Sequence, residues 1–142
     1  MNFKFLKLTS IKEMLSTIDL VKELTPDIKS ETYEKMLHEM VPHNYFQVVV
    51  YDSDKLVGVS GYWISTKIYC EKYLEIDNLV IAKEYRSKNI GKQLVDWMTD
   101  EAKRNDCKTI LLDAYIENFK AHKFYYREGF IARGFHYLKK LN

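Results

Sequence analysis

The 142-residue sequence has few cysteines and no cluster of histidines. Its two cysteines, Cys70 and Cys107, form neither a CxxC pair nor a metal-ligand spacing, and a disulfide between them has no support in the sequence. The four histidines are scattered, so we expect no zinc-type site and no metal in the function. Two ordinary thiols in a sequence without an export signal are typical of a protein in a reducing compartment, and we therefore expect a cytoplasmic protein.

Long apolar runs and an excess of charge of one sign are also missing. No apolar stretch reaches the roughly 18 residues that span a bilayer, and the first ten residues alternate instead of forming the apolar block of a signal peptide. The 22 basic and 20 acidic side chains give a formal net charge of +2. Nucleic-acid binding usually needs a strong basic surplus, so we expect neither a nucleic acid nor a membrane as partner.

Glycine and proline are scarce, with five and two residues, and no linker rich in them divides the chain. Neither a repeat nor a low-complexity segment interrupts the sequence. What is present is a globular balance of 46% hydrophobic and 30% charged residues. This length and composition predict one domain over residues 1–142.

Hydrophobic periodicity predicts a mixed α/β fold built on a central sheet. Alternating or β-branched segments predict strands at 3–8, 44–51, 56–64, 72–81 and 108–115, with one or two closing strands in 130–140. Apolar stripes at helical spacing predict helices from Ser10 to about Leu24, at about 28–41 and 90–104, and from Asn118 to Gly129. We therefore expect six to seven strands and about four helices, in the order strand, two helices, three strands, helix, strand, helix, strand.

Alternation along the strand expected at 72–81 separates its side chains into two sets. Leu74, Ile76 and Val80 would lie on one face. The other face would carry Glu75, Asp77, Leu79 and Ile81.

A basic, glycine-containing loop from Tyr85 to Gly91 joins this strand to the next helix. The first amides of a helix have no intrahelical partner, and the helix dipole is positive at that end, so such a loop is suited to a phosphate group. Arg86, Lys88 and Lys92 add positive charge at the same place. The loop is neither a P-loop nor a Rossmann fingerprint, because both glycine patterns are absent.

Residues 86–92 resemble the acetyl-CoA loop of the GNAT superfamily, in which Arg or Gln is followed by Gly three positions later and by Gly or Ala five positions later. Arg86 and Gly91 match the first and last positions, and Asn89 stands where Gly is usual. Asn is one of the few residues that enter the left-handed region readily, so the anion-binding backbone can be kept. Residues 79–81 are similar to the family strand that pairs with the pantetheine arm.

A second signature strengthens the resemblance. Residues 118–130 are similar to the family pattern N-x-x-A-x-x-F/L-Y-x-x-x-G-F, and the expected element order fits from residue 3 to residue 140. The resemblance implies the GNAT fold with acetyl-CoA as co-substrate and no metal. The residues that match the second signature are Asn118, Ala121, Phe124, Tyr125, Gly129 and Phe130.

The resemblance also implies a role for each matching residue. Glu75, eleven residues before Arg86, is the first choice as general base, with Asp77 as second choice and ordered water as an alternative to both. Tyr125 is similar to the tyrosine that protonates the coenzyme A thiolate, and Asn118 would cap a helix and contact the cofactor. The implied cofactor-binding residues are Leu79, Val80, Ile81, Arg86, Ser87, Lys88, Asn89, Ile90, Gly91, Lys92, Asn118 and Tyr125.

The predicted activity is acetyl transfer from acetyl-CoA to a primary amine, by direct attack in a ternary complex. The acceptor is a small-molecule amine or a peptide or protein amine, and the sequence leaves open whether the protein forms a homodimer. A non-catalytic acyl-CoA sensor or protein-interaction module on the same fold is the alternative, because Asn89 departs from the loop pattern. An aromatic slot with carboxylates would suit a cationic acceptor, and its candidate residues are Glu23, Asp27, Glu31, Glu34, Glu39, Tyr62, Trp63, Tyr69, Tyr73 and Tyr115.

Overall fold

The computed structural model describes residues 2–142. The chain forms two compact units, the first ending at Leu111 and the second running from Leu112 to Asn142. The first unit holds most of the sheet, and the second holds the last helix and the C-terminal segment.

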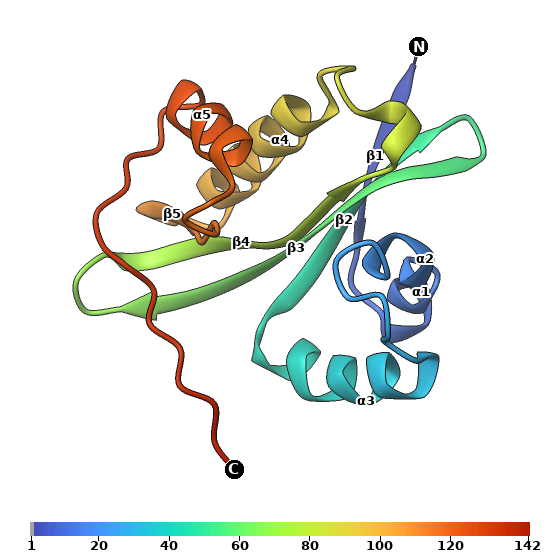
Figure 1. The fold of residues 1–142 in the computed structure, drawn as a ribbon, viewed down its shortest axis with the longest axis horizontal. Coiled ribbons are helices and arrows are strands. Elements are labelled where there is room, and N and C mark those ends of the chain that lie inside the picture. Colours follow the sequence, from blue (N-terminus) through green and yellow to red (C-terminus); the bar gives the residue numbers. More distant parts are fainter. Residues whose placement is uncertain (1) are drawn as a thin grey trace. The chain divides into compact units, whose positions relative to one another are not determined.

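The sheet of the described residues has five strands in the order β1-β2-β3-β4-β5 (Figure 1). The first four strands follow one another as antiparallel neighbours. The predicted mixed α/β class is thereby confirmed. The strands are β1 (Phe3–Leu8), β2 (Tyr45–Asp52), β3 (Lys55–Lys67), β4 (Glu71–Ile81) and β5 (Thr109–Leu112).

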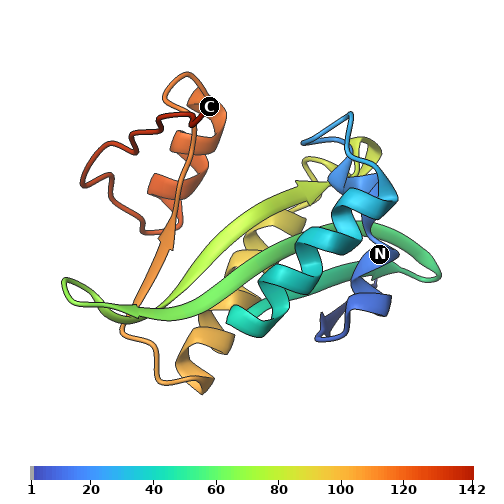
Figure 2. The same ribbon diagram turned by 90° about the horizontal axis from the view of Figure 1, so that it is seen from below.

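Helices cover both faces of this sheet in the first unit. Figures 1 and 2 show α1 (Ile11–Leu15), α2 (Ile18–Val21) and α3 (Ser30–Met40) on one face, and α4 (Ile90–Arg104) on the other. A short 3₁₀ turn follows α3 (η1, Val41–His43), and another precedes the loop to α4 (η2, Lys83–Tyr85). The helix predicted at 90–104 is confirmed with its bounds.

The alternation of the strands supplies an apolar layer to each face. Val49, Val59 and Val80 belong to the core beneath α1–α3, together with Met14 and Leu37 of those helices. The neighbours of Val49 along β2 are also fully buried and point to the opposite face, where α4 lies. Ile90, Leu94, Val95, Met98 and Ala102 are the buried apolar residues of α4.

A buried carboxylate ties α4 to the sheet. Glu101 is 4% exposed, and its carboxylate accepts hydrogen bonds from the Tyr62 hydroxyl at 2.6 Å and from Lys7 at 2.7 Å. Arg104 lies 3.1 Å away on the same helix. Burial by itself raises the pKa of Glu101, but the hydrogen bonds from Lys7 and Tyr62 favour the charged form, and the net pKa is lowered.

The N-terminal helix predicted from Ser10 to Leu24 is two short helices, so the expected count of about four becomes five α-helices among residues 2–142. The chain breaks after α1, where the buried Thr17 hydroxyl donates to the Met14 carbonyl at 2.7 Å and contacts the Tyr33 hydroxyl at 2.8 Å. A threonine hydroxyl that binds the carbonyl three residues back competes with the helical pattern. Tertiary contacts therefore override the periodicity here.

The closing strands predicted in 130–140 are absent from the described structure, so the sheet has five strands and not six to seven. The segment alternates in sequence, but alternation only permits a strand. Its large apolar side chains are mostly exposed, Ile131 by 75% and Tyr137 by 88%. No burial of those side chains offsets the entropy of ordering a strand.

The second unit contains α5 (Phe119–Arg127). The Asn118 side chain caps it by accepting a hydrogen bond from the Ala121 amide at 3.2 Å, as predicted. Gly129 follows the helix with φ of 95°, which is the left-handed region that favours glycine. The predicted helix between Asn118 and Gly129 is confirmed.

Candidate functional site

A bulge in β4 decides which way the candidate site residues point. Gly61 of β3 pairs with Asp77, but Val59 pairs with Val80, so β4 has one more residue than β3 over this stretch. Residues paired directly across a ladder share a face. Asp77 and Val80 therefore lie on the same face, which corrects the strict alternation predicted for this strand, because the bulge at 78–79 shifts the period by one residue.

The bulge is fixed by a close contact with β3 and β2. Asn78 has φ of 37° and accepts a hydrogen bond from the Tyr45 hydroxyl at 3.0 Å. A Cβ atom at Gly61 would overlap with both the Tyr45 hydroxyl and the Asn78 side-chain oxygen. Gln47 donates to the Tyr45 hydroxyl at 3.1 Å, so the contact continues into the buried core. The shape of β4 thus depends on the absence of a side chain at residue 61.

The two candidate bases lie next to Trp63 on the face covered by α3. Trp63 pairs directly with Glu75 across the ladder and contacts the core beneath α1–α3. The indole nitrogen of Trp63 donates to the Asp77 carboxylate at 2.9 Å, and the Asn78 amide donates to the other Asp77 oxygen at 2.8 Å. Asp77 is therefore held in place as an acceptor, whereas Glu75 is half-buried beside the indole.

The loop between β4 and α4 enters the helix through two residues with left-handed backbone. Ser87 and Asn89 both lie in the left-handed region, with φ of 65° and 66°. Asn89 is the N-cap of α4, and within the described chain its side chain makes no capping hydrogen bond. The first amides of the 15-residue helix are thus left without an intrahelical partner at the positive end of its dipole. The structure confirms that Asn89 takes the conformation usual for glycine.

The cations of the loop are held by weak surface contacts. The Arg86 guanidinium donates to the Ile81 carbonyl at 3.2 Å and pairs with Glu23 at 3.3 Å. Lys92 pairs with Asp96 one turn along α4 at 2.9 Å. Exposed pairs of this kind contribute at most about 1 kcal/mol, so either cation can exchange its carboxylate for a phosphate.

In the second unit, Tyr125 is a half-buried aromatic residue of α5, as is the adjacent Phe124. Its ring lies edge-on to Phe124 at 5.1 Å and to Phe130 at 5.6 Å between centroids. Burial raises the pKa of the Tyr125 hydroxyl. The phenol therefore keeps its proton at and above neutral pH, as an acid must. Asn118 is exposed at the start of the same helix.

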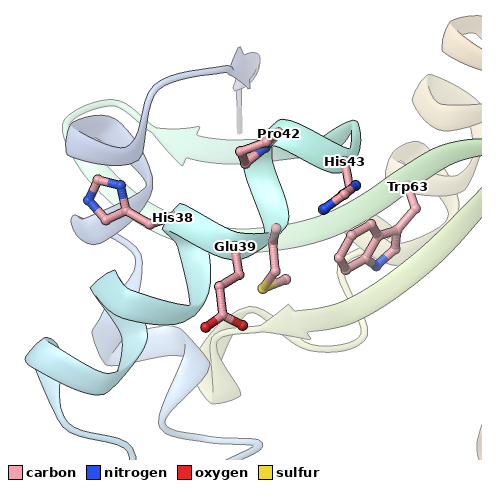
Figure 3. A pocket seen from close by; sticks show the side chains of 6 residues that line it. His38, Glu39, Pro42, His43 and Trp63 are labelled. Atoms are coloured by element: carbon pink, nitrogen blue, oxygen red, sulfur yellow. The ribbon is translucent and has the colours of Figure 1, made fainter.

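An open pocket of about 580 Å³ lies where α3 ends. Figure 3 shows His43 next to Trp63 and the Glu39 side chain extending from α3, whereas His38 points away from Trp63. Of the ten acceptor candidates, Glu39 and Trp63 meet here. Tyr62 lies on the opposite face of β3 and bonds Glu101, because adjacent strand residues alternate. The pocket is lined by His38, Glu39, Met40, Pro42, His43 and Trp63.

Sequence reasoning missed three features of this region. The bulge could have been found from the sequence, because Gly61 lies inside a strand and Asn78 is of a residue type that strands disfavour. The role of Tyr45 had no such signal, and for the pocket lining the sequence offered Glu39 and Trp63 only as two of ten acceptor candidates, because both features depend on residues distant in sequence. The predicted site residues Glu75 and Asp77 lie within β4, and residues 86–92 form the loop before α4 and its first turn, all in the first unit.

Among residues 2–142, no three His, Cys, Asp or Glu side chains are gathered as a bound metal ion would require. In the same part of the chain, every helix is too short or too polar to cross a membrane.

Comparison with known proteins gives a consistent result. The sequence model of the acetyltransferase (GNAT) family matches residues 12–130. An uncharacterized N-acetyltransferase of Bacillus subtilis, YhdJ, is 28% identical over 120 residues, which covers 84% of each chain. Two solved structures share the fold. Glucosamine-6-phosphate N-acetyltransferase from Arabidopsis thaliana has a TM-score of 0.77 at 24% identity, with all of both chains covered. An aminoglycoside N-acetyltransferase in complex with CoA has a TM-score of 0.82 at 16% identity, with 99% and 96% covered.

Proposed function

Because the chain belongs to the acetyltransferase (GNAT) family and is therefore an acyltransferase, we propose that it transfers the acetyl group of acetyl-CoA to a primary amine. The acceptors named for two structural relatives, glucosamine 6-phosphate and aminoglycosides, are both amines. The family match crosses the boundary between the two compact units, which supports a single catalytic domain over residues 1–142.

The loop before α4 is the observation that carries the proposal. Its two left-handed residues turn the chain so that the first amides of α4 remain available, and Arg86, Lys88 and Lys92 surround that end with positive charge. These residues fit a pyrophosphate of coenzyme A. We assign Leu79, Val80 and Ile81 of β4 to the pantetheine arm, with Ser87, Asn89, Ile90 and Gly91 at the phosphates and Asn118 as a further contact.

Acetyl-CoA supplies an activated acetyl group as a thioester. An alkylamine has an ordinary pKa near 10.4, so at pH 7 only about one molecule in a thousand is neutral and able to attack. Glu75 accepts the proton of the ammonium group directly or through water, and Asp77 is the second choice. The Tyr125 hydroxyl donates its proton to the departing sulfur. The amine attacks directly, within a ternary complex.

Asn89 was the feature that favoured a non-catalytic sensor, and its left-handed backbone in the structure removes that argument. A cytoplasmic location and a homodimer stay predictions. The expectation that neither a metal nor a nucleic acid takes part is likewise unchanged.

The decisive experiment is calorimetric titration with acetyl-CoA, followed by thiol release with a panel of amines. We expect binding in the micromolar range and an increase in Kd of about tenfold for Arg86→Ala, since one charged phosphate contact is lost. Lys103→Ala is the matched control, because it removes a positive charge from the opposite end of α4 and should leave Kd unchanged. Equal losses in both variants, or none in Arg86→Ala, would show that the loop does not hold the phosphates. Binding without thiol release would identify the sensor alternative.

The general base is tested by the pH dependence of kcat in Glu75→Gln and Asp77→Asn. Loss of the base should lower kcat about 100-fold at pH 7. The deficit should shrink toward pH 10, because the free amine then needs no help to lose its proton. We expect this pattern in Glu75→Gln and a smaller, pH-independent effect in Asp77→Asn. The reverse pattern would exchange the two roles, and a flat ratio in both variants would leave water as the base.

A further inference from the structure

The pocket at the end of α3 lies beside the candidate base but outside the cofactor loop. We propose that it selects the acceptor, and that the acceptor is a dicationic amine such as a short aliphatic diamine. One ammonium group is held at Glu39 and Trp63, and the other amine is presented at Glu75. This inference rests on the proposed function, since it names the acceptor class of the same site.

The charges of the pocket favour a cation. With histidine counted as neutral, Glu39 carries the one formal charge among the six lining residues. Asp77 adds a second carboxylate at the edge of the indole, 2.9 Å from its nitrogen. The last three residues of α3 are His38, Glu39 and Met40, and the helix dipole is negative at that end. A phosphate-bearing amine would be repelled by all three sources of negative potential.

The aromatic wall favours a cation that is partly desolvated. Trp63 is half-buried, and its ring packs against the ring of the fully buried Tyr45, with 4.9 Å between the two centroids. The bond to Asp77 fixes the indole orientation and makes the ring more electron-rich. An ammonium group over a tryptophan face is attracted by the ring quadrupole, and Met40 and Pro42 supply apolar contacts for a methylene chain.

The register of the sheet sets the length of the acceptor. Trp63 and Glu75 are directly paired across β3 and β4, so their Cβ atoms lie about 5 Å apart. An amine anchored over the indole can therefore reach the Glu75 carboxylate through a chain of a few methylene groups. The anchoring ammonium stays charged in the pocket, while the reacting amine loses its proton to the base.

The experiment compares three acceptors and three variants. Cadaverine carries two ammonium groups, pentylamine has the same carbon chain with one, and glucosamine 6-phosphate is an amine with a negative group. We expect kcat/KM to be about tenfold higher for cadaverine than for pentylamine and lowest for glucosamine 6-phosphate, as the loss of one charge contact implies. Glu39→Gln should abolish the preference for cadaverine over pentylamine. Trp63→Leu should raise KM for cadaverine about tenfold as the ring contact is lost.

Glu34→Gln is the matched control, because Glu34 is an exposed carboxylate of the same helix that does not line the pocket. It should keep the preference of the wild-type protein. The proposal is overturned if glucosamine 6-phosphate is the best acceptor, or if Glu39→Gln and Glu34→Gln behave alike.

Equilibrium binding separates this inference from the proposed function. Cadaverine is titrated into the protein saturated with coenzyme A, and heat is measured instead of turnover. If no amine supports thiol release but cadaverine binds more tightly to the wild-type protein than to Glu39→Gln, the proposed function fails and the pocket assignment stands. If acetyl transfer occurs but Kd for cadaverine is the same in both proteins, the function stands and the pocket assignment fails.

Discussion

Replacing Tyr125 by phenylalanine is expected to lower kcat about 100-fold while Kd for acetyl-CoA changes less than about twofold. The hydroxyl is the group removed, and the ring keeps its contacts with Phe124 and Phe130. In the proposed mechanism the departing thiolate then loses its proton donor, whereas the loop proposed to bind the cofactor is untouched. Stopped-flow thiol release and calorimetry on the same preparation measure the two quantities separately.

Tyr126→Phe is the control for this experiment, because Tyr126 is the adjacent, exposed residue of the same helix. It should retain wild-type turnover. Burial raises the pKa of Tyr125, so the acid stays protonated as pH rises through the range where an ordinary tyrosine begins to ionise. Wild-type kcat should therefore hold up to about pH 10. Unchanged turnover in Tyr125→Phe would remove the residue from the reaction.

Gly61→Ala is expected to destabilise the fold by about 3 kcal/mol, because overpacking a closed site forces the backbone or side chains to move. The new Cβ would overlap with the Tyr45 hydroxyl and the Asn78 side-chain oxygen, which are themselves hydrogen-bonded at 3.0 Å. The strand can relieve the overlap only by giving up the bulge or the buried network. Urea unfolding monitored by circular dichroism gives the free energy of unfolding.

Gly58→Ala provides a matched comparison in the same strand. A Cβ at Gly58 meets Val50 and Ile81 at 3.4 Å and beyond, close to ordinary contact. Its stability should remain within about 1 kcal/mol of the wild-type protein. Similar losses at both glycines would mean that the cost comes from strand glycine in general and not from the close approach at the bulge. Gly61→Ala should also reduce kcat in the folded fraction, since residues 77–81 would shift.

The loop proposed to hold the cofactor is the part of the candidate site whose backbone was predicted best from the sequence. Its features are local: a strand end, a basic turn, a left-handed Asn89 and a helix start at Ile90 all follow from neighbouring residues. The capping of α5 by Asn118 is local in the same sense. Interactions within about four residues depend little on the rest of the fold, so pattern and propensity are sufficient there.

The predicted facing of the side chains after Asp77 in β4 was wrong, because the sequence pattern offered only a period of two. The bulge arises because Gly61 lets Tyr45 and Asn78 approach across two strands, and neither partner is near the other in sequence. The split of the first helix has a similar origin in the contact of Thr17 with Tyr33. In both cases a buried hydrogen bond between distant residues outweighs a weak local preference.

The sequence by itself determined the α/β class and the order of elements up to α5 apart from the split of the first helix, and it supplied the residues that are proposed for the site. It did so because apolar periodicity and helix-end chemistry are written in short stretches of chain. Only the tertiary structure decided the strand count and the bulge in β4. It also placed Trp63 opposite Glu75 and brought the Trp63 indole into a hydrogen bond with Asp77. It also decided which of ten acceptor candidates line a pocket. Those features depend on register and burial, which exist only once distant segments have come together.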